Sequence, residues 1–337
     1  MEQPTQNGWE QKALDREIFE RELDRYVPDR VFDAHAHLYR QNDIAQGTVI
    51  RSLMAGGPQE VTLEQFRRHI SWILPGRHVD GLFIPWPIRG DVASLNRFVQ
   101  EQVRGAPDCR AELLITPDMD PDWIRQEVRE HGLAGLKCYH VFAPGNPTWE
   151  AEIETYLPEA QVRVADREGM CITLHLVRSR ALADASNLDT IHRYCQRYPN
   201  MKLILAHAGR GFNPHHTIMG VQHLKGLTNI WFDTSAITDC GALEAVMAAF
   251  GHERLLYGSD YFQSHIRGRC VAIGDSFLWL LDHMSDWKAF HAEVKPTLVG
   301  IESLRVLKLA IINQRLSDGQ IEDIFWNNAR RMLGIAD

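Results

Sequence analysis

The organisation of this chain is set by residues 31–38, VFDAHAHL, which combine the pattern of a buried strand with two closely spaced histidines. Side chains alternate between the two faces of a strand, so Asp33, His35 and His37 are expected on one face and the apolar residues on the other. A polar inner row with an apolar outer row is typical of a closed parallel barrel covered by helices. We therefore expect a (β/α)₈ barrel, with both imidazoles near the end where its strands finish.

Length and composition favour a large folded domain that acts on a small molecule. A chain of 337 residues with 45% hydrophobic residues can bury a sizeable core. The net charge of −8, with no basic run longer than a pair, argues against nucleic acid or an anionic membrane as a partner. A small-molecule substrate is the better expectation, and a homodimer is the prior for such barrels.

Cysteine usage and the N-terminal sequence predict a cytoplasmic protein. The six cysteines are scattered without a C-x-x-C pair, as in a reduced protein rather than a disulfide framework. The first twelve residues, MEQPTQNGWEQK, lack the basic and apolar regions of a signal peptide. No apolar run reaches the roughly 20 residues that a membrane-spanning helix needs.

Seven further strand-like runs follow the opening strand and alternate with amphipathic segments. The runs cover residues 79–88, 109–118, 133–140, 170–177, 202–209, 229–236 and 254–261. Helices are expected between them near 91–104, 121–130, 151–168, 188–198, 214–226 and 240–251. Eight strands alternating with helices predict the α/β class and a (β/α)₈ TIM barrel. A doubly wound sheet ranks second because no G-x-G-x-x-G follows the first strand.

The segments around these repeats predict additions to the barrel. Residues 1–30 are expected to form an N-terminal helical extension, with an amphipathic helix over 10–26, and residues 31–337 a single barrel domain. The long insertion after the first strand, 39–78, should hold a helix over 63–74, capped by Thr62, and a flap over the barrel mouth. The tail should be an extended helical segment, with helices near 273–290, over 299–314 and from 318 onward, that seals the outside of the barrel.

Ionisable residues recur where the predicted strands end. His175, His207 and Asp260 stand at the ends of three later runs, which places them at the same rim as His35 and His37. Imidazole and carboxylate groups are the ligands of catalytic zinc, and histidine titrates near neutrality. Either later histidine alone could be a core residue bonded to a backbone carbonyl, but the combination favours a metal centre.

The ordered motifs closely resemble those of the amidohydrolase superfamily, in particular the amidohydrolase-related branch that includes aminocarboxymuconate semialdehyde decarboxylase. They are FDAHAHL on the first strand, TLH at its fifth, LAHAG at its sixth, YGSD at its eighth and the terminal NNARRML. The resemblance implies one divalent metal ion, usually Zn²⁺ with Mn²⁺ or Fe²⁺ possible, bound by His35, His37, His175 and Asp260. It also implies His207 as the proton shuttle, with Asp260 sharing the catalytic role.

Four residues are candidates for binding the substrate: Lys137, His140, Arg178 and Arg210. Lys137 has three readings: a carboxylated lysine that bridges two metals, as in some superfamily members, an ammonium that faces the substrate, or a structural residue. Arg178 and Arg210 each follow a strand-end histidine by three residues, where a guanidinium could hold a carboxylate. On weaker grounds, the mouth could also be lined by Tyr39, Trp86, Trp149 and Arg267. Asp33 is either an orienting partner of the site or a simple buried hydrogen-bonding group.

Two reactions and one non-catalytic reading remain open at this point. The first is hydrolysis of an amide, lactone or related C–N or C–O bond in a small, carboxylate-bearing substrate through a metal-activated water. The alternative is non-oxidative decarboxylation of an unsaturated or aromatic acid at the same metal site. The third is a barrel that keeps a metal or ligand site without catalysis.

Overall fold

The computed structural model describes residues 9–46, 56–282, 286 and 293–336, in which eight parallel strands form a curled sheet. The strands in sheet order are β1 (Arg30–Arg40), β3 (His78–Pro85), β4 (Arg110–Leu114), β5 (Gly135–Cys138), β6 (Cys171–Leu174), β7 (Lys202–Leu205), β8 (Ile230–Asp233) and β9 (Leu255–Leu256). The sheet closes because Ala34 N–H donates to the Tyr257 carbonyl and Asp260 N–H donates to the His35 carbonyl. The predicted (β/α)₈ barrel is confirmed.

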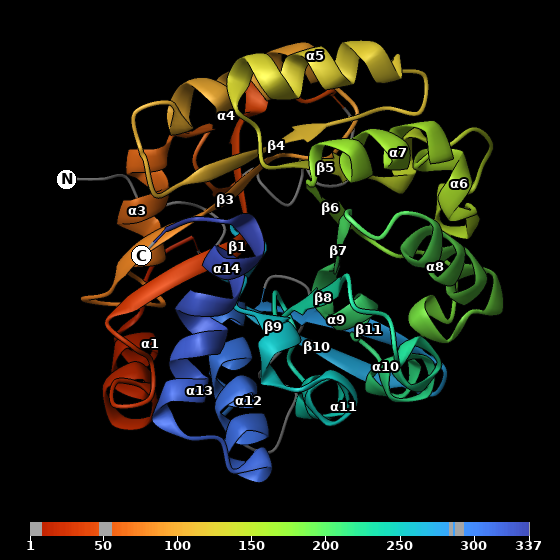
Figure 1. Ribbon diagram of the computed structural model, residues 1–337. Helices are drawn as coiled ribbons and strands as arrows, with labels where there is room; N and C mark the ends of the chain where they lie inside the picture. Colours follow the sequence, from red (N-terminus) through yellow and green to blue (C-terminus); the bar gives the residue numbers. More distant parts are fainter. Residues whose placement is uncertain (1–8, 47–55, 283–285, 287–292, 337) are drawn as a thin grey trace.

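Helices surround the strands, as Figure 1 shows. The main ones are α3 (Leu63–Ile70), α4 (Val92–Val103), α5 (Pro121–His131), α6 (Ile153–Tyr156), α7 (Glu159–Glu168), α8 (Ala185–Arg197), α10 (Pro214–Val221), α11 (Cys240–Phe250) and α12 (Val299–Gln314). Side chains of Thr62, Asp91, Asp120, Asp184 and Asp239 accept hydrogen bonds from backbone N–H groups at the first turns of five of them. These caps satisfy N–H groups that have no partner within the helix, which explains where each helix begins.

The first strand departs from the predicted alternation of side chains. The pairing of β1 with β3 shifts between Asp33 and Ala36, which inserts one extra residue into β1. Phe32 and Ala34 consequently pack among residues inside the barrel, whereas Ala36 packs in the larger core shared with the helices. The expectation that Phe32, Ala34, Ala36 and Leu38 share one face was wrong, because a bulge reverses the alternation within a strand.

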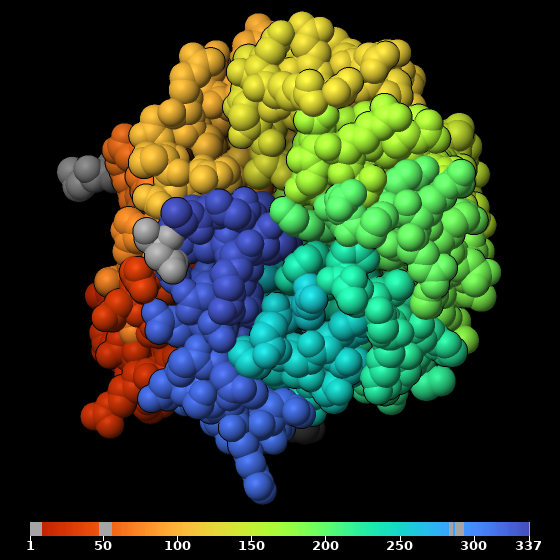
Figure 2. Space-filling view, viewed as in Figure 1, coloured from red at the N-terminus to blue at the C-terminus, as the bar shows by residue number. Residues whose placement is uncertain are grey.

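The C-terminal residues close the end of the barrel at which the strands begin. Helix α13 (Asp318–Glu322), the π-helical turn η12 (Asp323–Asn327) and α14 (Asn328–Leu333) run across this end. Trp326, Ala329 and Met332 pack with Phe32, and Figure 2 shows this C-terminal segment in blue over the centre of the face. The tail was expected on the outside of the barrel, but this part of it plugs the barrel's interior.

The tail also contains a hairpin where a helix was expected. Strands β10 (Gly268–Ile273) and β11 (Ser276–Leu281) pair antiparallel, so the helix predicted near 273–290 is wrong over residues 273–281. Its remaining part falls mostly outside the described residues. The signal for the hairpin was the two-residue loop Gly274–Asp275, in which Gly274 adopts a φ of +56° that glycine tolerates.

The N-terminal residues are fastened to the loop after β9. Helix α1 (Ala13–Ile18) continues into the π-helical turn η1 (Phe19–Leu23), and Arg267 forms a buried ion pair with Asp15 at 2.8 Å. The division into a terminal extension and one barrel domain stays a prediction.

In the long insertion, strand β2 (Glu60–Val61) pairs antiparallel with the end of β1. The flap expected there stays untested, because residues 47–55 lie outside the described part. Among the described helices, none is long and apolar enough to cross a membrane.

Candidate active site

A cavity of about 470 Å³ opens at the end of the barrel where the strands finish. Residues from many elements line it: His35, His37, Trp86, Pro87, Lys137, Tyr139, His175, His207, Arg210, Phe212, Asp260, Gln263, Phe277, Trp279 and Leu281. All five residues expected at the metal centre are among them. Residues that follow different predicted strands, up to 225 positions apart in the case of His35 and Asp260, therefore meet in one cavity.

His35, His37 and Asp260 form a compact group of possible ligands in this cavity. One donor atom from each lies within 4.8 Å of the others, and His37 Nε2 is 3.4 Å from Asp260 Oδ1. His37 Nδ1 lies 3.2 Å from the carbonyl of Ile84, to which a protonated Nδ1 donates. This hydrogen bond leaves Nε2 of His37 with a free lone pair facing the carboxylate.

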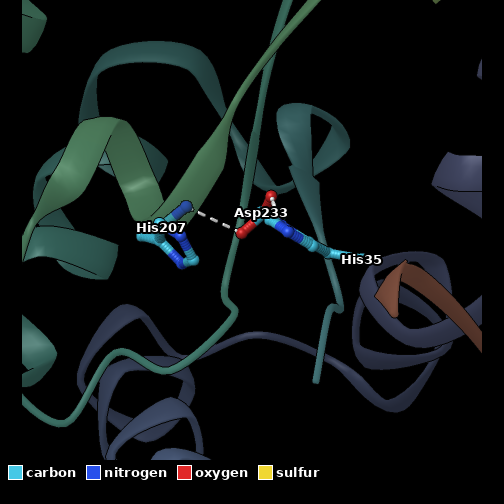
Figure 3. Close-up of side chains that lie close together, drawn as sticks. All are labelled: His35, His207 and Asp233. Carbon is cyan, nitrogen blue, oxygen red and sulfur yellow. Dashed lines mark hydrogen bonds and ion pairs between the residues drawn. The ribbon is translucent and has the colours of Figure 1, made fainter. Parts of the chain in front are cut away.

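Asp233 supports the group from behind and was not identified from the sequence. Its Oδ2 accepts a hydrogen bond from His35 Nδ1 at 2.9 Å, and its Oδ1 accepts from His207 N–H at 2.8 Å. Figure 3 shows the carboxylate between the two histidines. The Ser235 N–H and hydroxyl also donate to Oδ1, at 3.1 and 2.5 Å. A histidine whose Nδ1 is held this way presents Nε2 in a fixed direction.

The sequence does carry a signal for Asp233. Asp233 ends β8, so it obeys the same strand-end rule that selected His175 and Asp260. His35, His207 and Asp233 also lie close enough together to suggest a second ligand group. Their mutual hydrogen bonds already use the Asp233 oxygens and His35 Nδ1, so this trio is better described as the support of the first group.

His207 lies on an unusual turn rather than at the end of a strand. β7 stops at Leu205, earlier than predicted, and His207, Ala208 and Gly209 all have left-handed backbone conformations with φ of +55°, +51° and +74°. Such conformations cost energy in residues other than glycine and cluster at functional sites. The turn directs the His207 ring so that Nδ1 lies 3.0 Å from the Ser235 carbonyl and 4.0 Å from Asp260 Oδ2.

His175 lines the cavity but stands apart from the compact group. It follows the last residue of β6, and its ring packs at 5.1 Å from the rings of Tyr139 and His207. Its Nδ1 is buried and has no hydrogen-bond partner among the described residues. Cys171 and Thr173 of β6 both contact Glu112, so these alternate residues lie on one face of the strand. A buried ring nitrogen without a partner lowers the stability of the fold, which indicates that His175 is suited to act as a metal ligand.

Burial and neighbouring charges keep the imidazoles neutral and the carboxylates ionised. Burial lowers the pKa values of His35, His37 and His175. Burial alone would raise the pKa of Asp260, but His37 and the other nearby histidines, His207 and His35, lower it. For Asp233, burial is likewise outweighed by His35 and His207, and its pKa falls to about 2. Neutral imidazole and ionised carboxylate are the forms that bind metal.

Lys137 projects from β5 to the cavity and is almost fully buried. Burial lowers its pKa, while the charges of Glu112 and Asp233 oppose that shift. Burial raises the pKa of Glu112 to about 7. This environment fits a lysine that faces a substrate, and a carboxylated, bridging form stays a prediction.

The two arginines with matching spacing have different environments. Arg178 forms ion pairs with Glu152 and Asp184 at 2.6 and 3.0 Å, and it does not line the cavity. Arg210 lines the cavity and donates from Nη1 to the carbonyl of Arg178 at 2.6 Å. Sequence spacing could not separate the two, because the Arg178 partners come from other segments of the chain.

The other candidates for the mouth are divided as well. His140 lies just behind the lining, with Nδ1 3.0 Å from Thr148 Oγ1 and its ring 6.2 Å from that of His175. Trp86 lines the cavity, whereas Trp149 is 59% exposed and is not part of the lining. Tyr39 is buried behind Trp86, with its ring 5.9 Å away, and Arg267 is used in the ion pair with Asp15.

Asp33 is tied to the backbone of the last barrel segment. Its Oδ1 accepts hydrogen bonds from the N–H groups of Ser259 and His35, at 2.9 and 3.1 Å. Burial raises its pKa to about 7. Of its two readings, the structure therefore agrees with a buried hydrogen-bonding group, which helps hold β1 against the chain near Asp260.

A model of the amidohydrolase family matches residues 32–335. Because this match spans most of the chain, the chain belongs to the amidohydrolase superfamily of enzymes. A comparison with curated protein sequences finds no match.

Solved structures with a similar fold include both hydrolases and a decarboxylase. An amidohydrolase from Burkholderia multivorans with bound HEPES is 14% identical, covers 91% of this chain and 99% of its own, and has a TM-score of 0.61; a second crystal form contains zinc. A probable 2-pyrone-4,6-dicarboxylic acid hydrolase from Acinetobacter baumannii with bound citric acid is 13% identical, with coverages of 90% and 99% and a TM-score of 0.56. The 5-carboxyvanillate decarboxylase of Sphingomonas paucimobilis is 13% identical, with coverages of 92% and 100% and a TM-score of 0.57. At these identities the likeness shows a shared fold.

Proposed function

We propose that the chain is a metal-dependent hydrolase that cleaves an amide, lactone or related C–N or C–O bond in a small, carboxylate-bearing substrate. His35, His37, His175 and Asp260 hold one divalent ion in this proposal, and His207 moves the proton. The observation that carries it is the convergence of His35, His37 and Asp260 within 4.8 Å in one cavity.

The donor set fits a metal ion. The imidazoles are neutral and the Asp260 carboxylate is ionised. His175 adds a buried ring nitrogen without a partner among the described residues. Imidazoles with one carboxylate suit Zn²⁺ best, with Mn²⁺ or Fe²⁺ as the alternatives. A bound divalent ion supplies Lewis acidity at this point of the cavity.

The protein residues account for the movement of protons. Asp260 is ionised, so it can orient an attacking water and accept its proton. The His207 ring lies beside Asp260, with Nδ1 4.0 Å from Asp260 Oδ2. Because Nδ1 donates to the Ser235 carbonyl, Nε2 is the nitrogen that takes up the proton. His207 can then deliver that proton to the leaving group.

Two cations favour an anionic substrate. Lys137 and Arg210 both line the cavity, and Lys137 is almost fully buried. A guanidinium can form two parallel hydrogen bonds with a carboxylate, and an ammonium contributes a compact charge. We therefore assign substrate binding to Lys137 and Arg210, whereas Arg178 acts by holding Arg210 through its backbone carbonyl.

Decarboxylation of an unsaturated or aromatic acid is the second candidate. Aromatic side chains supply much of the lining, from Trp86, Tyr139, Phe212, Phe277 and Trp279. Apolar surroundings disfavour a carboxylate relative to the more dispersed charge that forms as CO₂ leaves. His207 or Asp260 would then protonate the carbon that loses CO₂.

Metal analysis of the purified protein tests the common basis of both candidates. We expect about one equivalent of divalent metal, and a strong loss of it in His37→Asn. The matched control is His192→Asn, because His192 lies outside the cavity and contacts the carbonyl of His223. Full metal content in His37→Asn would contradict the assignment.

A panel of lactones, amides and aromatic acids in ¹⁸O-labelled water separates the two reactions. Hydrolysis incorporates the label into the product, whereas decarboxylation releases CO₂ without incorporating label at a cleaved bond. Release of CO₂ alone would replace our first candidate by the second.

A further inference from the structure

The β10–β11 hairpin forms one wall of the cavity. Phe277, Trp279 and Leu281 lie at alternate positions of β11, and all three line the cavity. Alternate residues of a strand share a face, so Leu278 points away from it and is 38% exposed. The wall that this hairpin presents to a bound molecule consists largely of aromatic rings.

Arg210 is positioned against this wall. Its guanidinium carbon lies 5.2 Å from the centre of the Phe277 ring, within the range of a cation–π contact. Its Nη1 donates to the carbonyl of Arg178. In the described ranges, no carboxylate forms an ion pair with Arg210. Burial lowers the pKa of its guanidinium. Its remaining N–H groups are available to an anionic ligand.

Phe212 connects the hairpin with the catalytic centre. Its ring lies 5.1 Å from that of Phe277 and 5.4 Å from that of Trp279. On its other side it lies 5.1 Å from the His207 ring, tilted by 31°. The hairpin therefore belongs to a continuous set of aromatic contacts that ends at the proposed proton shuttle.

The hairpin is also fixed in position. Asn213 Nδ2 donates to the carbonyls of Gly274 and Ser276 at 3.0 Å each, which fastens the tip to the start of α10. His216 Nε2 lies 2.9 Å from Asp275 Oδ1 at the same tip. These polar contacts fasten the tip of the hairpin to the first turn of α10.

We propose that Phe277 and Trp279 are specificity-determining residues that select flat, conjugated carboxylates over saturated ones of the same size. Arg210 binds the carboxylate, and the two rings contact the face of the ligand. A flat π-system gains from ring contacts beyond the area that it buries, and a puckered ring does not. This proposal rests on the proposed function only in taking the cavity as the substrate site.

The test compares benzoate with cyclohexanecarboxylate, which share a carboxylate and a six-membered ring. Binding of each to the purified protein is measured by titration calorimetry, with and without added Zn²⁺. We expect benzoate to bind about fivefold more tightly, as one ring contact provides. The ratio should fall below about twofold in Phe277→Leu and in Trp279→Leu. Arg210→Gln should weaken both acids about tenfold and leave their ratio unchanged.

Two further variants separate specificity from general damage. Leu278→Ala lies on the same strand but outside the cavity, so it should keep the wild-type ratio. Trp279→Phe retains an aromatic ring and should keep most of it. Equal binding of the two acids to the wild type, no binding of either at millimolar concentration, or an unchanged ratio in both leucine variants would overturn the proposal. Metal content and turnover are measured separately, so their failure with the ratio intact would count against the proposed function alone.

Discussion

The two ends of the barrel are built from different kinds of side chain, although the same strands run through both. At the end where the strands begin, Trp326 and Met332 pack against Phe32 in a close apolar plug. At the other end, His35 and Asp260 converge around a cavity of about 470 Å³. The end where the strands begin stabilises the fold through apolar packing. The end where they finish buries polar groups, which lowers stability but forms the candidate site.

The transition between the ends takes place within β1. Before its bulge, Phe32 and Ala34 belong to the apolar interior, and after it His35 and His37 line the cavity. The extra residue at the bulge reverses the alternation of side chains, so that His35 and His37 point into the cavity. Substitutions on either side of this boundary should therefore change different properties.

The largest effect is expected from Asp260→Asn at the polar end. Loss of the ionised carboxylate removes a proposed ligand and proton acceptor, so turnover should fall about 10³-fold or more. The fold should survive, because the variant keeps the size of the side chain. Steady-state kinetics and circular dichroism check this, and substantial turnover in Asp260→Asn would mean that the site is misassigned.

Trp326→Ala should act on the apolar end. The indole is 5% exposed, and the guanidinium carbons of Arg30 and Arg330 lie 4.9 and 4.6 Å from the centre of its ring. Its removal should lower the free energy of unfolding by about 3–5 kcal/mol. Metal affinity of the folded protein should stay unchanged. Denaturant unfolding and metal titration measure the two, and a matching loss of metal affinity would show that the ends are coupled.

Asp233→Asn tests the support behind the polar end. The amide can accept from the His207 N–H but orients the His35 ring less firmly than the carboxylate does. We expect metal affinity to fall about 10- to 100-fold, with activity partly recovered at high metal concentration. Competition with a chromogenic chelator measures this, and an unchanged affinity would leave Asp233 with a purely structural role.

The smallest effect on turnover and stability is expected from Cys195→Ser, because Cys195 belongs to neither the apolar plug nor the cavity. Cys195 is buried on α8, outside the cavity lining. Turnover and metal content should stay near the wild-type values, with a loss of stability of about 1 kcal/mol. A loss of turnover equal to that of Asp260→Asn would contradict the placement of the site.

The sequence by itself determined the barrel and indicated five residues of its polar end, His35, His37, His175, His207 and Asp260. Alternating strand-like and amphipathic segments are local patterns, and they were sufficient to predict eight strands in the right order. The position of His175 and Asp260 after two of these runs then implied a common rim, because parallel strands finish at the same end of a barrel. The motifs FDAHAHL and YGSD added the family to this prediction.

Only the tertiary structure decided how these residues are held and which neighbours face the substrate. The bulge in β1 depends on pairing with β3, and the support of His35 by Asp233 joins residues 198 positions apart. Arg178 and Arg210 have the same spacing from a histidine, yet only Arg210 lines the cavity. Such contacts depend on packing between segments that are distant in the sequence, and a local pattern of residues does not predict that packing.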